Sequence, residues 1–180
     1  MESGKNSPYF FFEAQAKKKQ AKKKSKKNIS KKDAGNDGFE SPIEISGDEI
    51  CRKNTKQALK LLFEKDEDGF QAAVSNLGKI ECAASGSGVY VWEKPVRFKV
   101  GAATYNAGPV WFASVLVHES RHSAQYKAEK KYSGKEAELE CLEAQIDTLK
   151  KIGAGQSTID YVQKISQSEY WLVNENQRWW

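Results

Sequence analysis

The sequence predicts an α+β domain that is mostly helical and carries a small antiparallel β-hairpin. Apolar residues recur at helical spacing over most of the chain after residue 47, and one short stretch alternates apolar and charged side chains as a strand does. With 180 residues, 39% of them apolar and 11% aromatic, the chain suffices for one domain of ordinary size with its own core. We therefore expect a tail, residues 1–47, followed by one compact domain, residues 48–180.

The predicted tail is rich in lysine. Residues 1–47 contain eleven Lys and six acidic residues, and the remaining 18 basic and 18 acidic residues balance, so the tail carries the whole net charge of +5. The tract Lys17–Lys32 repels itself and cannot bury enough surface to fold, so we expect disorder up to Gly47. The tract is either a solvated linker, a localisation signal, or a weak contact to nucleic acid or to an anionic membrane.

Cysteine spacing and hydropathy limit the class of protein further. Cys51, Cys82 and Cys141 lie far apart without a Cys-x-x-Cys pair, so we expect reduced, buried thiols and neither a disulfide framework nor a cysteine zinc site. The sequence has no run of 18 apolar residues, and the apolar run Tyr9–Phe12 is too short for a secretory signal. These observations predict a cytoplasmic protein, a protein exported by a route other than Sec, or a fragment of a longer polypeptide.

Two helices are predicted at the start of the domain. Ser46 or Asp48 can cap the first, which has apolar residues at helical spacing and ends near the break at residues 65–69. The second covers Phe70–Leu77 and is stopped by Gly78.

A hairpin and three further helices follow. Val89–Trp92 and Val96–Val100 read as two strands joined by a turn. Pro109 suits the first position of the next helix, which we expect to run to about Lys130. The last two helices are predicted at Glu136–Ile152 and at Thr158–Ile165, the latter capped by Ser157, before an aromatic C-terminal end.

The helix that follows Pro109 contains the chain's two histidines. His118 and His122 lie four residues apart with Glu119 between them, in the pattern HExxH. The preceding Val110–Val117 is apolar on nearly every side of a helical wheel, so we expect a buried helix whose polar groups must be satisfied or bind something. Side chains four apart share one face, so both imidazoles can reach a single ion. Glu119 is rotated by about 100° and can reach a water bound to that ion.

A third ligand must be a carboxylate, because a catalytic zinc site takes three protein ligands and no further histidine exists. At about 100° per residue, Glu138 and Gln145 fall within the inward apolar stripe of the helix Glu136–Ile152. We therefore predict Glu138 as the third ligand, with a buried ion pair to Arg121 or to a lysine as the alternative. The other acids fall on the side of two lysines: Glu136, Glu140, Glu143 and Asp147.

His118-Glu-Ser-Arg-His122 followed by Glu136-Ala-Glu138-Leu-Glu-Cys141 resembles the gluzincin type of zincin metallopeptidases, over roughly Gly88–Gly155. The resemblance implies a zincin-like domain, one Zn²⁺, two histidine ligands and a glutamate ligand on the next helix. In that family a small residue often follows three positions after the glutamate, and Cys141 fills this position. The resemblance also implies an antiparallel edge strand that holds an extended substrate, and Val96–Val100 is placed for this role.

One departure from the family concerns the second layer around the metal. Many gluzincins have an acid four residues after the glutamate ligand, where this chain has Leu142. Glu143 does have Asp147 four residues on, and its distance from His122 resembles the thermolysin-like arrangement, so Glu143 remains the alternative third ligand. Gln125 faces the same side as His122, so we expect it to hydrogen-bond a ligand, to line the cleft or simply to pack.

The expected function is that of a zinc-dependent metallopeptidase acting on a protein or peptide. Glu119 would serve as the general base that activates a zinc-bound water. Four residues are candidate donors to the oxyanion: Arg121, Tyr161, Tyr170 and Arg178. Two alternatives stay open, namely a catalytically inactive binding module on the zincin scaffold, or the peptidase effector domain of a larger secreted toxin.

Overall fold

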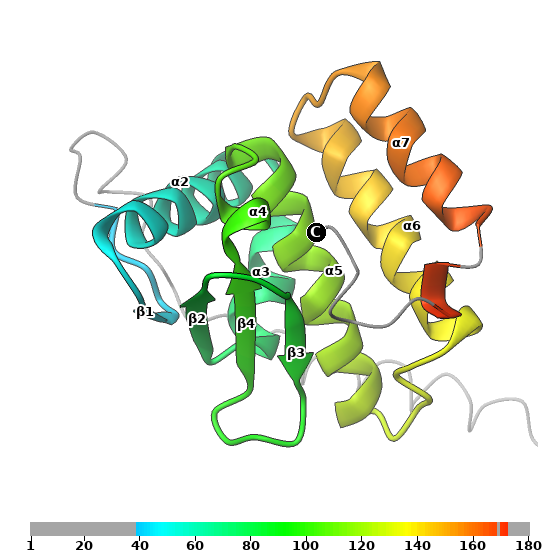
Figure 1. Cartoon of the computed structure of the whole chain (residues 1–180), viewed down its shortest axis with the longest axis horizontal. Coiled ribbons are helices and arrows are strands. Elements are labelled where there is room, and N and C mark those ends of the chain that lie inside the picture. The colour runs from blue at the N-terminus through cyan, green and yellow to red at the C-terminus, as the bar shows by residue number, and fades with distance from the viewer. Residues whose placement is uncertain (1–38, 169, 173–180) are drawn as a thin grey trace, which may run out of the picture. The chain divides into compact units, whose positions relative to one another are not determined.

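The computed structural model describes residues 39–168 and 170–172 (Figure 1). The contacts divide the chain into Met1–Gly38 and a second unit that begins at Phe39 and holds all the described residues. This unit is α+β and mostly helical. Its helices are α2 (Glu49–Lys65), α3 (Glu67–Asn76), α4 (Ala102–Tyr105), α5 (Pro109–Lys127), α6 (Lys135–Lys151), α7 (Gln156–Ser166) and the short 3-10 helix η2 (Tyr170–Leu172).

The sheet has four strands: β1 (Glu44–Ser46), β2 (Lys79–Ala83), β3 (Gly88–Tyr90) and β4 (Arg97–Gly101). Their spatial order is β1-β2-β4-β3. The predicted hairpin is the antiparallel pair of β3 and β4, whereas β1 pairs with β2 and β2 pairs with β4 in parallel. The sheet is therefore mixed and larger than the predicted antiparallel hairpin. The prediction of an edge strand at Val96–Val100 is wrong, because β4 is an inner strand and β3 forms the edge.

The predicted boundary at Gly47 is also too late. β1 and the residues from Phe39 onward belong to the folded unit, although we expected disorder up to Gly47. The parallel pairing of β1 with β2 supplies the backbone partners of this short segment, and a three-residue strand leaves no periodic trace in a sequence. The tract Lys17–Lys32, with the contacts predicted for it, lies outside the described residues.

Local sequence signals account for most helix ends. The Asp48 carboxylate accepts a hydrogen bond from the Cys51 amide and caps α2. Pro109 occupies the first turn of α5, which ends at Lys127 rather than near Lys130. The predicted Ser157 cap of α7 is wrong, because the helix begins two residues earlier, after Gly155, without a side-chain cap.

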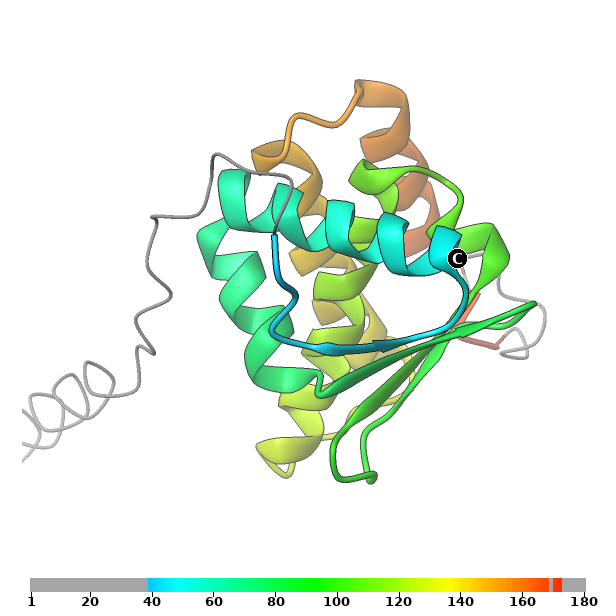
Figure 2. The ribbon, with the colours of Figure 1, turned by 90° about the vertical axis from the view of Figure 1, so that its left-hand side faces the viewer.

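The helices pack against one face of the sheet. Figure 2 shows the sheet edge-on with the long helices on one side of it. The inward side chains Phe98 and Val100 of β4 lie in one buried cluster with Phe112 and Leu116 of α5. None of the helices within residues 39–168 and 170–172 is long and apolar enough to span a membrane.

Asp66 holds the junction between α2 and α3 against α6. Its buried carboxylate accepts hydrogen bonds from the Gly69 amide at 3.1 Å, the Thr148 hydroxyl at 2.8 Å and the Lys151 ammonium at 3.0 Å. Burial raises the pKa of Asp66, but these hydrogen bonds outweigh burial and hold it below its usual value. This contact fixes the far end of α6, the helix that carries the predicted third ligand.

Cys51 and Cys82 form a disulfide, so the prediction of reduced thiols is wrong for this pair. The two residues are 31 positions apart, and the packing of α2 on the sheet brings their Cα atoms to 6.4 Å. Gly47 makes room for the bond, because a Cβ there would lie 2.5 Å from the Cys82 sulfur. Its φ of +151° also favours glycine. Cys141 is a free, buried thiol, as predicted.

Candidate metal centre

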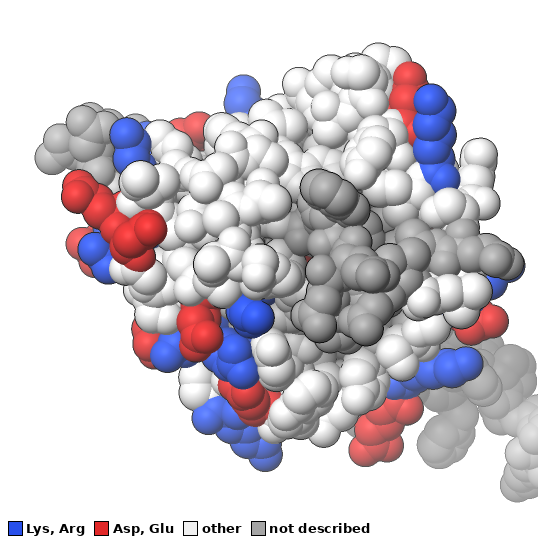
Figure 3. Space-filling model, in the orientation of Figure 1, with Lys and Arg blue, Asp and Glu red and all other residues white. Residues whose placement is uncertain are grey.

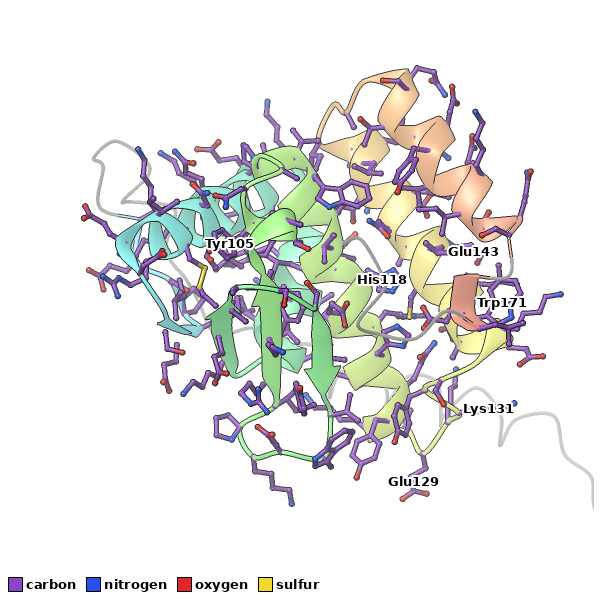
Figure 4. The ribbon with its side chains drawn as sticks, viewed as in Figure 1. Tyr105, His118, Glu129, Lys131, Glu143 and Trp171 are labelled. Atoms are coloured by element: carbon purple, nitrogen blue, oxygen red, sulfur yellow. A yellow bond between two sulfur atoms is a disulfide. The ribbon has the colours of Figure 1, made fainter. Side chains whose placement is uncertain are left out.

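The two histidines of α5 and one carboxylate of α6 meet between these helices. His118 Nε2 and His122 Nε2 lie 3.2 Å apart, one helical turn from each other along α5. Glu138 Oε2 lies 3.4 Å from each of these nitrogens. All three side chains are buried, with 4–7% of their surface exposed. Figure 4 shows His118 between α5 and α6.

The other acids of α6 lie away from the imidazoles. Glu143, the alternative third ligand, is exposed and lies further along α6 (Figure 4). Glu140 pairs with Arg121 and accepts a hydrogen bond from Gln125 at 2.9 Å. The remaining two acids pair with surface lysines: Glu136 with Lys131, and Asp147 with Lys150. Of the five acidic residues on α6, only Glu138 comes within reach of both histidines.

The hydrogen bonds behind His118 determine which of its nitrogens carries the proton. The Ser114 hydroxyl donates to the Trp111 carbonyl at 2.8 Å, so its oxygen accepts from Gln145 Nε2 at 3.2 Å. Gln145 Oε1 then faces His118 Nδ1 at 3.1 Å and can only accept. His118 Nδ1 therefore carries the proton, and its Nε2 turns a lone pair towards Glu138 and His122.

A second chain of hydrogen bonds determines which nitrogen of His122 carries the proton. Gln125 Nε2 donates to the Ala137 carbonyl at 3.1 Å and to Glu140, so Gln125 Oε1 accepts from the Cys141 thiol at 3.8 Å. Burial raises the pKa of the Cys141 thiol, which favours the protonated form that donates this bond. The Cys141 sulfur then accepts from His122 Nδ1 at 3.4 Å. His122 Nε2 is left with a lone pair, as His118 Nε2 is.

Two nitrogen lone pairs and a carboxylate that face one another at this distance need a cation between them. In the absence of a metal, a proton takes this role. Burial would lower the pKa of His122, but its hydrogen bonds to Cys141 and Glu138 outweigh burial and raise the pKa to about 11. Burial likewise would raise the pKa of Glu138, but the hydrogen bonds to His118 and His122 hold it well below its usual value. The centre is thus built to hold positive charge.

His118, His122 and Cys141 form a buried group that could hold one metal ion, with donor atoms within 4.8 Å of one another. The position of the sulfur distinguishes this set from the one that contains Glu138. The Cys141 sulfur faces the outer nitrogen of His122, Nδ1, whereas Glu138 faces the inner nitrogens of both rings. A single ion bound by both Nε2 atoms would therefore lie closer to the Glu138 carboxylate than to the Cys141 sulfur.

The centre opens into a cavity of about 260 Å³. The buried Glu119 lines it beside the two histidines and Glu138. Edge strand β3 lines the cavity, and so do Tyr132 in the loop between α5 and α6 and Trp171 of η2. Figure 4 shows Trp171 beside the start of α6. The cavity therefore combines the HExxH glutamate, the histidines and carboxylate that could hold a metal ion, and the edge strand of the sheet.

The predicted oxyanion donors do not line this cavity where they are described. Tyr161 is half exposed on α7 and packs against Trp111, and Arg121 pairs with Glu140 at the surface. The side chain of Tyr170 and the whole of Arg178 lie outside the described residues. Two tyrosines that the sequence analysis did not select, Tyr90 and Tyr132, do line it.

The role of Gln145 was also missed. Its inward position on α6 was visible in the helical phase, but the partner that it contacts depends on the packing of α6 against α5. Comparisons with protein-family models, with curated proteins and with solved structures give no match to this chain. An assignment of function therefore rests on the centre itself.

Proposed function

We propose that this chain is a zinc-dependent metallopeptidase, with His118, His122 and Glu138 as the ligands of one Zn²⁺. The observation that carries the proposal is the triangle of donor atoms, with sides of 3.2, 3.4 and 3.4 Å. Ligands at about 2.0–2.1 Å from a tetrahedral zinc ion lie about 3.3 Å from one another. The donor atoms therefore already have the spacing of a tetrahedral site.

The chemistry of the donors agrees with a catalytic rather than a structural zinc site. Two neutral imidazoles and one carboxylate leave the fourth position to water or substrate, whereas structural sites are closed and rich in cysteine. Gln145 and Cys141 support the two proposed histidine ligands from outside. Each accepts a hydrogen bond from the Nδ1 atom of one histidine and so fixes its tautomer and ring orientation.

Glu119 is the proposed general base. A bound zinc ion would lower the pKa of its water towards neutrality and polarise the substrate carbonyl. Glu119 would take the proton from that water and pass it to the leaving amine, which peptide hydrolysis requires. The hydroxyl groups of Tyr90 and Tyr132 in the cavity wall are the donors that we assign to the developing oxyanion.

Edge strand β3 is the proposed binding site for the peptide backbone. It pairs with β4 on one side, and no other described strand pairs with its outer edge. The same strand lines the cavity that contains Glu119. An extended peptide can add to such an edge through main-chain hydrogen bonds, which places its amide bonds beside the metal centre.

Two measurements test this function. Elemental analysis of the full chain should find one zinc per molecule, lost in His122→Ala. The second measurement maps cleavage products from a proteome-derived peptide mixture, where the wild type should cut and Glu119→Gln should not, although it retains zinc. The matched control is Glu143→Gln, which changes an exposed acid of α6 and should leave both properties unchanged. A wild type that binds zinc and cuts nothing would overturn the enzyme and leave a binding module.

A further inference from the structure

The charges that line the cavity are unevenly distributed. Glu119 and Glu138 lie at the metal centre, where the histidines and the proposed ion balance them. Lys99 is the only lysine or arginine among the described residues that line the cavity. The cavity therefore has one cation that no part of the proposed hydrolytic chemistry uses.

Lys99 reaches the cavity from an inner strand because its neighbour on the edge strand is a glycine. In the register of β3 with β4, Lys99 lies directly opposite Gly88. A Cβ built on Gly88 would meet nothing within 4 Å, so the space above its backbone is open. Because Phe98 and Val100 point into the core, Lys99 points to the other face of the sheet, where its side chain can extend over Gly88 towards the cavity.

The neighbouring arginine on the same face is fully engaged, in contrast to Lys99. Arg97 makes two hydrogen bonds to Glu93, at 2.8 and 2.7 Å, pairs with Glu81 at 3.5 Å and covers the Tyr90 ring at 3.7 Å. No ion pair joins Lys99 to any residue of 39–168 or 170–172. Figure 3 shows basic and acidic side chains mixed over the strands of this face. Lys99 thus keeps its charge available within a surface where other charges are paired.

The rim beside Lys99 is held in place by buried hydrogen bonds. The Ser87 hydroxyl accepts from the Gly101 amide at 3.0 Å and shares a hydrogen bond with the Thr104 hydroxyl at 3.1 Å. Gly101 lies close to the loop, since a Cβ there would come within 2.9 Å of the Gly86 nitrogen. A substrate on this edge would therefore meet Lys99 at a fixed position along the strand.

We propose that Lys99 recognises a carboxylate of the peptide substrate and gives the enzyme a preference for an acidic group at one fixed distance from the cleaved bond. The proposal rests on the peptidase function proposed above. The carboxylate is either an aspartate or glutamate side chain or the α-carboxylate at the end of the peptide. A lysine in a half-buried cleft favours either group by charge complementarity.

The test uses pairs of synthetic decapeptides that carry a single Glu or a single Gln at successive positions, each with a free or an amidated C-terminus. For the wild-type full chain, kcat/KM should be about tenfold higher for Glu than for Gln at one position, as expected from about 1.4 kcal/mol for a partly buried charge pair. Lys99→Gln should bring the ratio close to one, and Lys99→Glu should invert it. The control is Lys53→Glu, the same charge change at an exposed position of α2. A preference for free over amidated ends would assign the α-carboxylate instead of a side chain.

Binding of the same peptides to the zinc-loaded Glu119→Gln protein provides a second readout without turnover. The Kd of each peptide for this protein should show the same preference for Glu over Gln. That preference should be lost in the Glu119→Gln/Lys99→Gln double variant. Cleavage with a Glu to Gln ratio that Lys99→Gln leaves unchanged would overturn the role of Lys99 alone. If the wild type cuts no peptide, the peptidase function fails, and a Glu preference in binding that depends on Lys99 would still support the recognition site.

Discussion

Replacement of Gln145 by leucine tests whether the hydrogen bonds behind His118 prepare it to bind a metal. Leucine removes the Oε1 atom that accepts the His118 Nδ1 proton at 3.1 Å, while it keeps similar volume in the buried interface of α5 and α6. The Ser114 oxygen also loses its donor at 3.2 Å. The change therefore acts on the outer side of the ring and removes no ligand.

The expected size of the effect follows from the charge on the ring. A hydrogen bond between neutral groups contributes about 0.5–1.5 kcal/mol, and one to a charged group about 1.5–3 kcal/mol. A metal ion on Nε2 makes the Nδ1 proton of His118 more positive, so the bond to Gln145 strengthens on binding by about 1.5 kcal/mol. Gln145→Leu should weaken zinc binding by about tenfold or somewhat more, within the range for residues that orient metal ligands.

Competition with a chromogenic chelator at fixed pH measures the zinc affinity of the wild type and of Gln145→Leu. Gln57→Leu, an exposed change on α2, is the matched control. Thermal unfolding of the metal-free proteins separates a loss of affinity from a loss of fold. An affinity within twofold of the wild type, in a folded variant, would refute the inference that Gln145 fixes the proton of His118.

Three further predictions concern the centre and its support. In elemental analysis, Cys141→Ser should keep one zinc per molecule, whereas Glu138→Ala should lose most of the zinc. Loss of zinc in Cys141→Ser and its retention in Glu138→Ala would instead make the Cys141 sulfur the ligand. Because the pKa of His122 is raised to about 11 without metal, zinc must displace a proton at neutral pH. Zinc affinity should therefore rise by about tenfold per pH unit between about pH 6 and 9, and a flat profile in chelator competition would contradict this. Asp66→Asn should reduce the free energy of unfolding by about 2 kcal/mol above pH 5, because the lowered pKa of Asp66 adds stability that is present above its unfolded pKa and is lost as pH falls through the folded value. Urea unfolding should show a larger difference from the wild type at pH 7 than at pH 3.

Features with a local cause could be predicted from the sequence. Pro109 and the apolar run after it predicted helix α5, and Asp48 was one of the two residues predicted to cap α2. The burial of Glu138 followed from helical phase, because one inward carboxylate among apolar residues needs a partner wherever the helix packs. These predictions needed no knowledge of which elements are neighbours in space.

Features that depend on distant neighbours could not be predicted in the same way. The parallel strands β1 and β2 are short and lie 35 residues apart in register, as in the pair Glu44 and Lys79. Without that pairing, the strand order was unknown and Val96–Val100 was mistaken for the edge. The hydrogen bonds of Gln145 and Cys141 to the two imidazoles likewise depend on the way α6 lies across α5.

The bond between Cys51 and Cys82 makes the fold sensitive to the redox state of its surroundings. It closes a loop of 31 residues, and the chain-entropy relation gives such a loop about 4 kcal/mol, a large part of the 5–15 kcal/mol that holds a typical domain together. Glutathione or thioredoxin would remove that contribution without changing any side chain of the candidate metal centre. Preparations made under reducing and oxidising conditions should therefore differ in how much folded protein survives purification.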